Sequence, residues 1–441
     1  MKILLISTYE LGHQPFGLAS PKAWLARDGH CVRAVDISVD ELTEAAIRES
    51  DLVAFYLPMH TATRLALPVI DRVKRLNPRA RMVCYGLYAP LNAELLHGLG
   101  VEAILGGEFE AGLVKLARGE AVNEISLERL EFITPDRADL PAPDRYARLR
   151  FMDAGQGAES KLVAYTEASR GCKHLCRHCP VVPVYRGNFR VVARDVVLAD
   201  IRQQVTAGAT HVTFGDPDFF NGPTHAIRIV NALHAEFPRV TYDATIKVEH
   251  LLENRDLLPV LRETGCLFVT SAVESVDDAV LARLEKNHTR EDFFETAGLM
   301  RAAGLTLQPT FIAFTPWTTV DGFRDLLRAL AELELIENVA PVQLALRLLI
   351  TSGSRLLELE EIRAVIGEFD SKSLVYPWVH DDPAVDRLAG RVFRLVAERQ
   401  KQGRSRGEIF QEICEVSDVS LDNYKLVARA AIPYLDEPWY C

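Results

Sequence analysis

Short apolar runs alternate with amphipathic stretches over residues 1–119. The runs are rich in Val, Ile and Leu, which favour strands, and the stretches between them have the apolar spacing of helices. The apolar runs are Ile3–Ser7, Cys31–Ile37, Leu52–Tyr56, Met82–Tyr85 and Ala103–Leu105, and the amphipathic stretches include Pro21–Asp28, Ser38–Glu49 and Thr61–Leu76. This alternation predicts an α/β domain with a doubly wound parallel sheet, which would bind ligands at the carboxyl ends of its strands.

The same alternation returns over residues 161–353. Six apolar runs are expected to be strands: Leu162–Thr166, His211–Phe214, Val240–Ala244, Leu267–Ser271, Leu307–Ala313 and Val342–Ile350. Helical segments separate these runs, as in a chain of strand–helix units. Six units are too few for a closed eight-stranded barrel, but polar residues at the carboxyl ends of such strands are the ones expected to carry chemistry.

Two further regions flank these units. Residues 120–160 are predicted to be a linker, because prolines and dense charges suit a connection laid over a surface. The prolines are Pro135, Pro141 and Pro143. Residues 354–441 are predicted to form a helical C-terminal region, with helical periodicity over Asp386–Gln402.

The composition indicates a globular chain of two or three domains. Of its 441 residues 48% are hydrophobic, and no run of 18 or more uncharged apolar residues stands out, so a membrane span is not expected. Eight cysteines without a pairing pattern suit a reducing compartment, so a cytoplasmic location is expected. The formal net charge of −11 argues against broad nucleic-acid binding, which needs a positive surface.

Three cysteines lie close together after the first predicted strand of the second region. Cys172, Cys176 and Cys179 form a C-x₃-C-x₂-C run. Thiolates at this spacing can hold one soft metal centre, and three ligands without an obvious fourth suggest an iron–sulfur cluster with one iron open to a small molecule. Zinc is the main alternative, because His174 and His178 are interleaved and zinc accepts mixed ligand sets. Disulfide bonds are a poor explanation, because three is an odd number of cysteines and the chain is expected to be cytosolic.

At these residues the sequence resembles the radical S-adenosylmethionine (SAM) superfamily. Its hallmark is this cysteine loop after the first strand of a partial (β/α)₆ barrel of the TIM type, which the six predicted units match. The resemblance implies a [4Fe–4S] cluster on Cys172, Cys176 and Cys179, with the open iron chelated by the amino and carboxylate groups of SAM. One electron would then cleave SAM to methionine and a 5′-deoxyadenosyl radical.

Two strand ends resemble SAM-binding segments of the superfamily. Gly215 and Asp216 stand where relatives often have a Gly-Gly-Glu-like element that receives the SAM amino group, and a loop that bonds its own backbone is the alternative. Glu274 and Ser275 resemble a Gly-x-Glu-Ser element that contacts SAM, often its ribose, although Ala272 replaces the glycine. A carboxylate can accept two hydrogen bonds from a ribose diol. Ser275 alternatively caps the following helix.

Two basic residues near strand ends are further candidates. Arg347 lies in the otherwise apolar sixth predicted strand and needs a partner, because burial of an unpaired charge is costly. That partner is either a carboxylate of SAM or substrate, or an Asp or Glu of the protein. Lys247 follows the third strand, and the same two interpretations apply to it.

Residues 1–119 resemble the cobalamin-binding domain that precedes many radical SAM barrels. The resemblance makes cobalamin a candidate cofactor. The chain departs from some cobalamin proteins because it lacks a D-x-H-x-x-G loop, which supplies an axial histidine there; His13 followed by Gly17 is only a faint echo of it. A structural or substrate-shaping domain on a common fold is the alternative.

The pattern from the first loop to the end of the chain is similar to radical SAM proteins with a CUAEP or CCAEP tail. In that group Cys or selenocysteine is followed by Ala-Glu-Pro. Here the sequence stops at Cys441, so either the tail is absent or a selenocysteine codon ended the recorded sequence. A selenium-free native protein whose mass ends at Cys441 would exclude the second interpretation. A frayed terminus with an incidental thiol is the structural alternative.

These features together predict a radical SAM enzyme that acts on a small-molecule or peptide substrate and receives electrons from a donor such as flavodoxin or ferredoxin. With cobalamin, methyl transfer to an unactivated carbon is the leading reaction. Without it, dehydrogenation, rearrangement or transfer of a SAM-derived group to a soft acceptor stays open. A tRNA-methylthiolating enzyme would need a basic RNA-binding appendage, against which the acidic balance counts. A non-catalytic metal-binding protein would carry zinc, or a cluster that never cleaves SAM.

Overall fold

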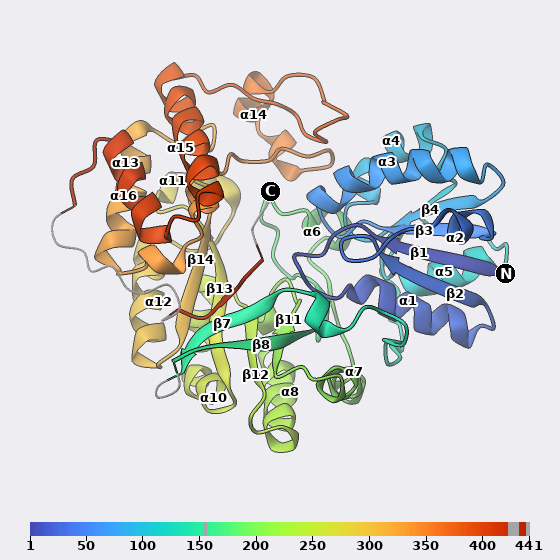
Figure 1. The fold of residues 1–441 in the computed structure, drawn as a ribbon. Coiled ribbons are helices and arrows are strands. Elements are labelled where there is room, and N and C mark those ends of the chain that lie inside the picture. Colours follow the sequence, from blue (N-terminus) through green and yellow to red (C-terminus); the bar gives the residue numbers. More distant parts are fainter. Residues whose placement is uncertain (154–156, 422–431, 438–441) are drawn as a thin grey trace.

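The computed structural model describes residues 1–153, 157–421 and 432–437. Within them the chain forms two large sheets that lie beside one another, each accompanied by helices (Figure 1). No helix in these ranges is long and apolar enough to cross a membrane. Cys441, the candidate terminal thiol, lies outside the described residues.

The first sheet is parallel throughout, with the strand order β2-β1-β3-β4-β5-β6. Its strands are β1 (Lys2–Ser7), β2 (Cys31–Asp36), β3 (Leu52–Tyr56), β4 (Arg81–Tyr85), β5 (Ala103–Gly107) and β6 (Ile125–Ser126). The helices between them are α1 (Phe16–Arg27), α2 (Glu44–Arg48), α3 (His60–Leu76), α4 (Ala93–Gly98) and α5 (Phe109–Ala117). The strand order reverses between β1 and β3, so the loops after these two strands border the crevice in which such sheets bind ligands.

Apolar side chains cover both faces of this sheet. Leu4 and Ile6 of β1 belong to one buried cluster, whereas Ile3 and Leu5 belong to another. Successive side chains of a strand point to opposite faces, so these two clusters lie on the two sides of the sheet. A strand buried on both faces has a continuous apolar sequence, which explains why the runs were visible in the chain. The predicted doubly wound sheet is confirmed.

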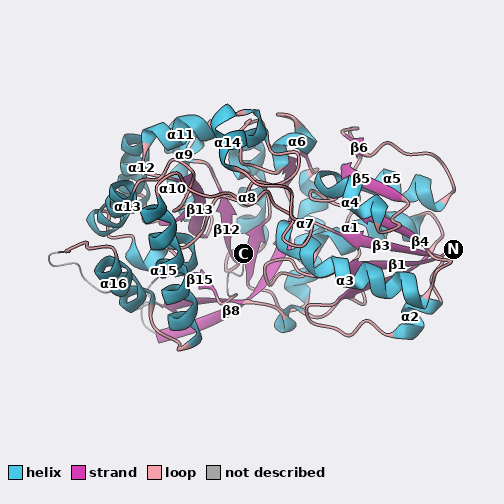
Figure 2. Cartoon of the chain, turned by 90° about the horizontal axis from the view of Figure 1, so that it is seen from above, coloured by secondary structure: helices cyan, strands magenta, loops and turns pink. Residues whose placement is uncertain are grey.

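The second sheet forms the wall of a partial barrel, with the strand order β14-β13-β12-β11-β8-β7-β15. Five of its strands run parallel: β8 (Gly157–Thr166), β11 (His211–Phe214), β12 (Thr241–Thr245), β13 (Cys266–Glu274) and β14 (Thr306–Phe311). An antiparallel edge is added by β7 (Arg148–Asp153) and β15 (Tyr434–Leu435). The predicted partial barrel is therefore present, and Figure 2 shows it beside the first sheet.

Helices follow the barrel strands as the pattern predicted. They are α7 (Arg194–Thr206), α8 (Pro223–Glu236), α9 (Val248–Glu253), α10 (Leu258–Glu263), α11 (Asp278–Leu284), α12 (Arg290–Ala302) and α13 (Val320–Glu332). A short ladder of β9 (Ser169–Gly171) and β10 (Phe189–Val191), with α6 (Val181–Tyr185) between them, follows β8. The cysteine loop begins directly after β9 of this ladder.

The sixth predicted strand, 342–350, forms only in part. Residues Pro341–Leu344 make a 3₁₀ turn, and the pairing that remains is a single parallel bridge between Phe314 and Arg347. Pro341 begins the turn because its fixed φ and missing N–H suit the first position of a helical turn. The barrel wall therefore ends in a bridge instead of a full strand.

Residues 120–160 are built into both domains. They supply β6 to the first sheet and β7 to the second. Arg137 of this segment is buried and donates to both carboxylate oxygens of Asp200 on α7, at 2.9 and 2.8 Å. It also donates to Gln14 Oε1, in the loop after β1, at 2.7 Å. The predicted linker thus contains a buried ion pair that ties the first domain to the barrel.

The C-terminal region is mainly helical over its described part. It contains α14 (Glu360–Val365), α15 (Pro383–Lys401) and α16 (Arg406–Val416). Asp382 caps α15, and Ser405 with Glu408 forms a capping box on α16. Val392 and Ile413 are fully buried in the same apolar cluster as the barrel. These helices therefore extend the barrel core instead of forming a separate unit.

Candidate functional site

The cysteine loop lies between β9 and α6, at the carboxyl end of β8. Cys172 and Cys176 are buried, and Cys179 is partly exposed. Gly171 enters the loop with φ +75°, and a Cβ there would lie 2.5 Å from the Asn188 carbonyl oxygen. Only glycine allows this close approach and this backbone conformation. The carboxyl end of the barrel thus receives three thiols on one loop.

The close ligand groups of the described residues bear on the choice between a cluster and a single zinc ion. Zn–S bonds of about 2.3 Å place two sulfur ligands of a tetrahedral site about 3.8 Å apart. In the described part of the chain, ligand atoms within 4.8 Å of one another occur in the group Cys172, His174 and Asp218, whereas the three cysteines form no such group. A zinc ion on that group would leave Cys176 and Cys179 unused. An iron–sulfur cluster takes its cysteines on separate irons, so its three thiols do not have to reach one ion.

The buried thiol groups keep their protons until a metal centre binds. Burial raises the pKa of Cys172 and raises the pKa of Cys179 to about 12. Two buried lysines oppose this effect, Lys247 at Cys172 and Lys286 at Cys179. Metal centres bind thiolates and release these protons, so the lysines help the site accept a negatively charged ligand set.

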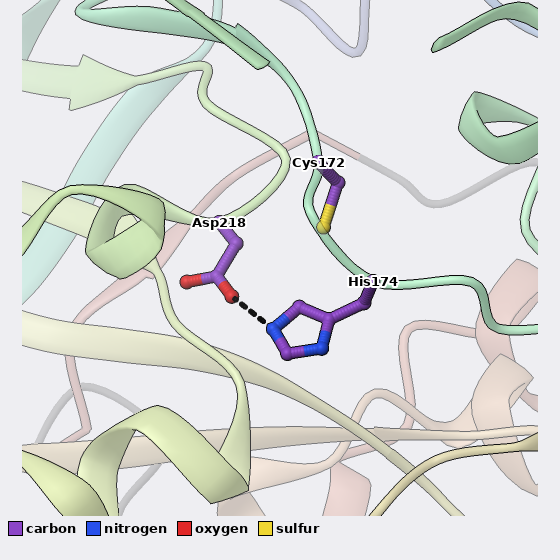
Figure 3. A group of neighbouring side chains, drawn as sticks. All are labelled: Cys172, His174 and Asp218. Carbon is purple, nitrogen blue, oxygen red and sulfur yellow. Dashed lines mark ion pairs between the residues drawn. The ribbon is translucent and has the colours of Figure 1, made fainter. Parts of the chain in front are cut away.

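His174 and Asp218 lie beside Cys172 (Figure 3), and His250 contacts both of them. His174 Nε2 lies 3.9 Å from Asp218 Oδ2 and 3.1 Å from His250 Nε2. His250 Nδ1 lies 2.7 Å from the same Asp218 oxygen. Burial, together with Lys247, lowers the pKa of His174 to about 3, so its ring is neutral. This group can hold or pass a proton next to the cysteine loop.

Sequence reasoning did not select His250. The signal that could have found it is its position in α9, directly after β12, because the carboxyl ends of neighbouring parallel strands meet at one edge of the barrel. Lys247, which precedes α9, is buried and lies 3.3 Å from Glu249. The structure therefore supplies a protein carboxylate for this lysine.

Glu274 lies against the cysteine loop, as the end of β13 predicted. Its Oε1 atom lies 3.2 Å from His178 Nε2 and 3.7 Å from Lys286 Nζ. Burial alone would raise its pKa, but Lys286 and His178 bring the pKa down to about 2. Its φ of +71° and the irregularity in strand register after Ala272 turn the side chain at the strand end. Strain of about 1–3 kcal/mol at such a residue is typical of functional sites.

Gly215 and Asp216 position the strand that leads into the cysteines. Asp216 is buried and accepts hydrogen bonds from the Ala168 N–H at 2.9 Å and the Ser169 hydroxyl at 2.5 Å. Burial raises the pKa of Asp216 to about 7. A Cβ on Gly215 would lie 2.2 Å from the Tyr165 hydroxyl, so glycine is needed for packing. Of the two interpretations of Asp216, contact with the SAM amino group and a loop that bonds its own backbone, the structure shows hydrogen bonds to the protein.

Ser275 and Arg347 have local partners. The Ser275 hydroxyl accepts from the Asp277 N–H, and Asp277 is the residue that caps α11. Arg347 donates to Asp386 Oδ1 at 2.6 Å, and its guanidinium lies 3.9 Å from the centre of the Trp378 ring. Of the two partners expected for Arg347, the structure shows the protein carboxylate, Asp386 of α15.

Arg170 joins the cysteine loop to the first domain. It donates to Glu110 through two nitrogens at 2.8 and 2.6 Å, and to Glu167 at 2.6 Å, and it lies 3.4 Å from Glu108. Glu108 and Glu110 follow β5 of the first sheet. A bidentate pair of this kind fixes geometry as well as contributing energy. The carboxyl ends of the two sheets are thus held together two residues before Cys172.

A cavity of about 180 Å³ lies beside this ion pair, between the domains. The first sheet contributes the loops after β1, β3, β4 and β5 to its lining, and the barrel contributes the segment before the cysteines and the loop after β11. Glu10, Tyr56, Glu167 and Arg170 are among the lining residues. The cavity therefore reaches the crevice of the first sheet and the base of the cysteine loop.

Comparison with known proteins agrees with this geometry. Residues 166–330 match the model of the radical SAM superfamily. A hopanoid C-3 methylase of Methylococcus capsulatus is 27% identical over 325 residues, which are 69% of this chain and 62% of that protein. The ribosomal protein uS12 methylthiotransferase RimO of Parabacteroides distasonis is 25% identical over 179 residues, 37% of this chain and 40% of that protein. The chain therefore spans less than two thirds of either relative.

Solved structures share the two-domain arrangement. The cobalamin-dependent SAM radical enzyme OxsB with aqua-cobalamin bound has a TM-score of 0.65 at 14% identity, over 88% of this chain and 66% of that one. The radical SAM methyltransferase TsrM from Kitasatospora setae has a TM-score of 0.60 at 15% identity, over 76% and 71%. At these identities the likeness shows the fold. The matched region, residues 166–330, contains the three cysteines and most of the partial barrel, so this part of the chain is similar to the radical SAM superfamily.

Proposed function

We propose that the chain is a radical SAM enzyme of the transferase type that cleaves SAM reductively and acts on a small-molecule substrate. The observation that carries this proposal is the loop of three cysteines at the carboxyl end of β8, inside the region that matches the radical SAM model, with the Glu274 carboxylate in contact with His178 of that loop. When bound, a [4Fe–4S] cluster and SAM supply a 5′-deoxyadenosyl radical that attacks unactivated C–H bonds.

The residues of the chain then have separate tasks. Cys172, Cys176 and Cys179 hold the cluster, and the buried Lys247 and Lys286 offset its negative charge. Glu274, ionised and aimed by its backbone, is suited to accept two hydrogen bonds from the ribose diol of SAM.

The surroundings of the site suit electron entry and a reducing compartment. An electron donor such as flavodoxin or ferredoxin is proposed to dock near the cysteine loop. The seven cysteines within the described ranges are free thiols, which suits the cytoplasm.

Methyl transfer is favoured over methylthiolation. The hopanoid methylase aligns over 69% of this chain, whereas the RimO protein aligns over 37%. Between residues 354 and 421 the chain forms helices that pack on the barrel, and no small β-barrel of the RNA-binding kind is present in that range. A peptide substrate is the second candidate, because the carboxyl end of an open barrel also admits an extended chain.

Cobalamin is a candidate ligand of this fold, and the described crevice is narrow for it. Gly106 and Gly107 are packed against Pro90 and the Ser126 carbonyl, where a Cβ would meet those atoms at 2.3 and 2.2 Å. The interdomain cavity of about 180 Å³ is below the roughly 300–1,000 Å³ of sites for drug-sized ligands, and a corrinoid exceeds that size class. His13, which only weakly resembles the axial histidine of some cobalamin proteins, is buried and stacks on the Tyr165 ring. This cavity alone is therefore smaller than a corrinoid, and no step is assigned to cobalamin.

Anaerobic reconstitution tests the proposal. Iron, sulfide, zinc and cobalt are measured, and the protein is incubated with SAM and dithionite. About four irons per chain and formation of 5′-deoxyadenosine are expected, and Cys176→Ala is expected to lose both. Cys31→Ala, at an exposed thiol of the first domain, is the matched control and keeps both. Zinc alone with intact SAM would contradict the proposal, and cobalt in the active protein would assign cobalamin to it.

A further inference from the structure

The cavity between the domains is lined by a buried carboxyl group that has no task in the proposed reaction. Glu10, in the loop after β1, is 5% exposed and lines the cavity. Its Oε1 atom accepts from the Tyr56 hydroxyl at 3.3 Å, and its Oε2 atom has no hydrogen-bond partner among the described residues. A buried polar atom without a partner costs free energy, so its retention indicates a ligand.

Arg170, which lines the same cavity, and Arg137, which acts on the charge of Glu10, are paired with other carboxylates. Arg170 donates to Glu110 and Glu167, and Arg137 donates to Asp200. Burial raises the pKa of Glu10 well above its ordinary value, and Glu167 adds to this effect. The wall of the cavity therefore offers a carboxyl group that a bound cation would ionise and pair with.

Aromatic rings form much of the remaining wall. Tyr56, Tyr165, Tyr185 and Phe109 line the same cavity. The faces of aromatic rings attract organic ammonium groups, and carboxylates next to such rings complete a site for them. An anion in this cavity would be repelled by the carboxylates of Glu10 and Glu167. A neutral apolar group would leave the free oxygen of Glu10 without a hydrogen-bond partner.

We propose that this cavity binds the primary ammonium group of an organic ligand, with Glu10 Oε2 as its counter-ion and the tyrosine rings as its walls. A volume of about 180 Å³ suits a small amine or the end of a longer one. Gly171, next to Cys172, is also part of the lining, so the remainder of the ligand can extend toward the cysteine loop. A further step rests on the proposed radical SAM function: the substrate of that reaction is then an amine anchored in this cavity.

Binding of n-butylammonium to the anaerobically reconstituted protein tests this site. Saturation-transfer NMR and calorimetric titration measure the affinity, with n-butanol as the neutral probe of similar shape. The ammonium probe is expected to bind at least about tenfold more tightly than the alcohol, and Glu10→Gln is expected to remove that difference. Gln keeps the size of the side chain and the contact with Tyr56, so the variant is expected to keep the thermal midpoint of the parent. Glu44→Gln, at an exposed position of α2, is the matched control.

Equal affinity for the two probes, or equal ammonium binding by the parent and Glu10→Gln, would overturn the proposal. So would a co-purified corrinoid whose visible spectrum changes in Glu10→Gln, because the cavity would then belong to cobalamin. SAM cleavage is measured separately. A parent protein that cleaves SAM but shows no preference for the ammonium probe refutes the amine site alone, and a parent protein that prefers the ammonium probe but does not cleave SAM refutes the proposed function alone.

Discussion

His178 Nε2 lies 3.2 Å from Glu274 Oε1, and this contact joins the cysteine loop to the end of β13. Lys286 Nζ lies 3.7 Å from the same carboxylate oxygen. All three side chains are buried or nearly so, and a charge-assisted contact in such surroundings is stronger than one in water. The loop proposed to hold the cluster and the carboxylate proposed to hold SAM therefore move as one unit.

Glu274→Gln is expected to weaken SAM binding by at least about tenfold, or about 1.4 kcal/mol, because an amide accepts fewer hydrogen bonds from a diol than a carboxylate does. The variant is also expected to lower the free energy of unfolding by about 3 kcal/mol, since it leaves Lys286 buried without its counter-charge. Equilibrium dialysis of SAM and urea unfolding measure the two effects.

A second substitution separates these two effects. Lys286→Met combined with Glu274→Gln removes the unpaired cation and is expected to recover most of the lost stability. SAM binding is expected to stay weak in the double variant, because the carboxylate is still missing. Recovery of SAM binding together with stability would show that Glu274 only supports the fold.

The sequence predicted the features that depend on local pattern. Apolar strands buried on both faces, such as β1 and β3, are continuous in the chain, so the first sheet could be expected from it. The three cysteines were recognised because they lie within eight residues on one loop. Glu274 was found because it ends a strand, where barrel chemistry gathers.

The features that the sequence did not predict depend on partners distant in the chain. Arg347 pairs with Asp386, 39 residues later, and no local pattern indicates which carboxylate will meet it. The unpaired oxygen of Glu10 appears only once the barrel closes over the first sheet and commits Arg170 to Glu110. The sixth strand was overpredicted because apolar composition alone does not show that the chain turns at Pro341.

Arg347→Met is expected to lower the free energy of unfolding by about 1–2 kcal/mol, through loss of the Asp386 pair and of the contact with the Trp378 ring. SAM affinity is expected to stay within about twofold of the parent, because the guanidinium is already paired inside the protein. Urea unfolding and SAM dialysis on the same preparation measure both. A large loss of SAM affinity at unchanged stability would restore Arg347 to the cofactor site.

Arg170→Met is expected to lower the free energy of unfolding by about 3–5 kcal/mol, because it leaves the buried Glu108 and Glu110 without a cation. Arg170→Lys is expected to recover only part of this loss, since an ammonium cannot make the bidentate contact. Limited proteolysis of residues 120–160 should become faster in both variants, as the domains separate. Arg228→Met, at an exposed position of α8, is the control.

The carboxyl group of Glu108 faces groups from both domains. Burial raises its pKa to about 7, Glu110 and Glu167 add to this rise, and Arg170 and the Tyr185 hydroxyl oppose it. The unfolded chain has the ordinary pKa near 4.5. Between these two values the folded protein holds a proton at Glu108 that the unfolded chain has released.

Stability should therefore fall as the pH rises from about 4.5 through about 7, because the state that binds more protons is favoured at low pH. Glu108→Gln carries no such proton, so it is expected to match the parent near pH 5 and to exceed it near pH 8, by a few kcal/mol at most. Urea unfolding at pH 5, 6, 7 and 8 measures the difference, with Glu120→Gln, at an exposed position, as the control. Parallel curves for the parent and Glu108→Gln would show that Arg170 keeps Glu108 ionised throughout this range.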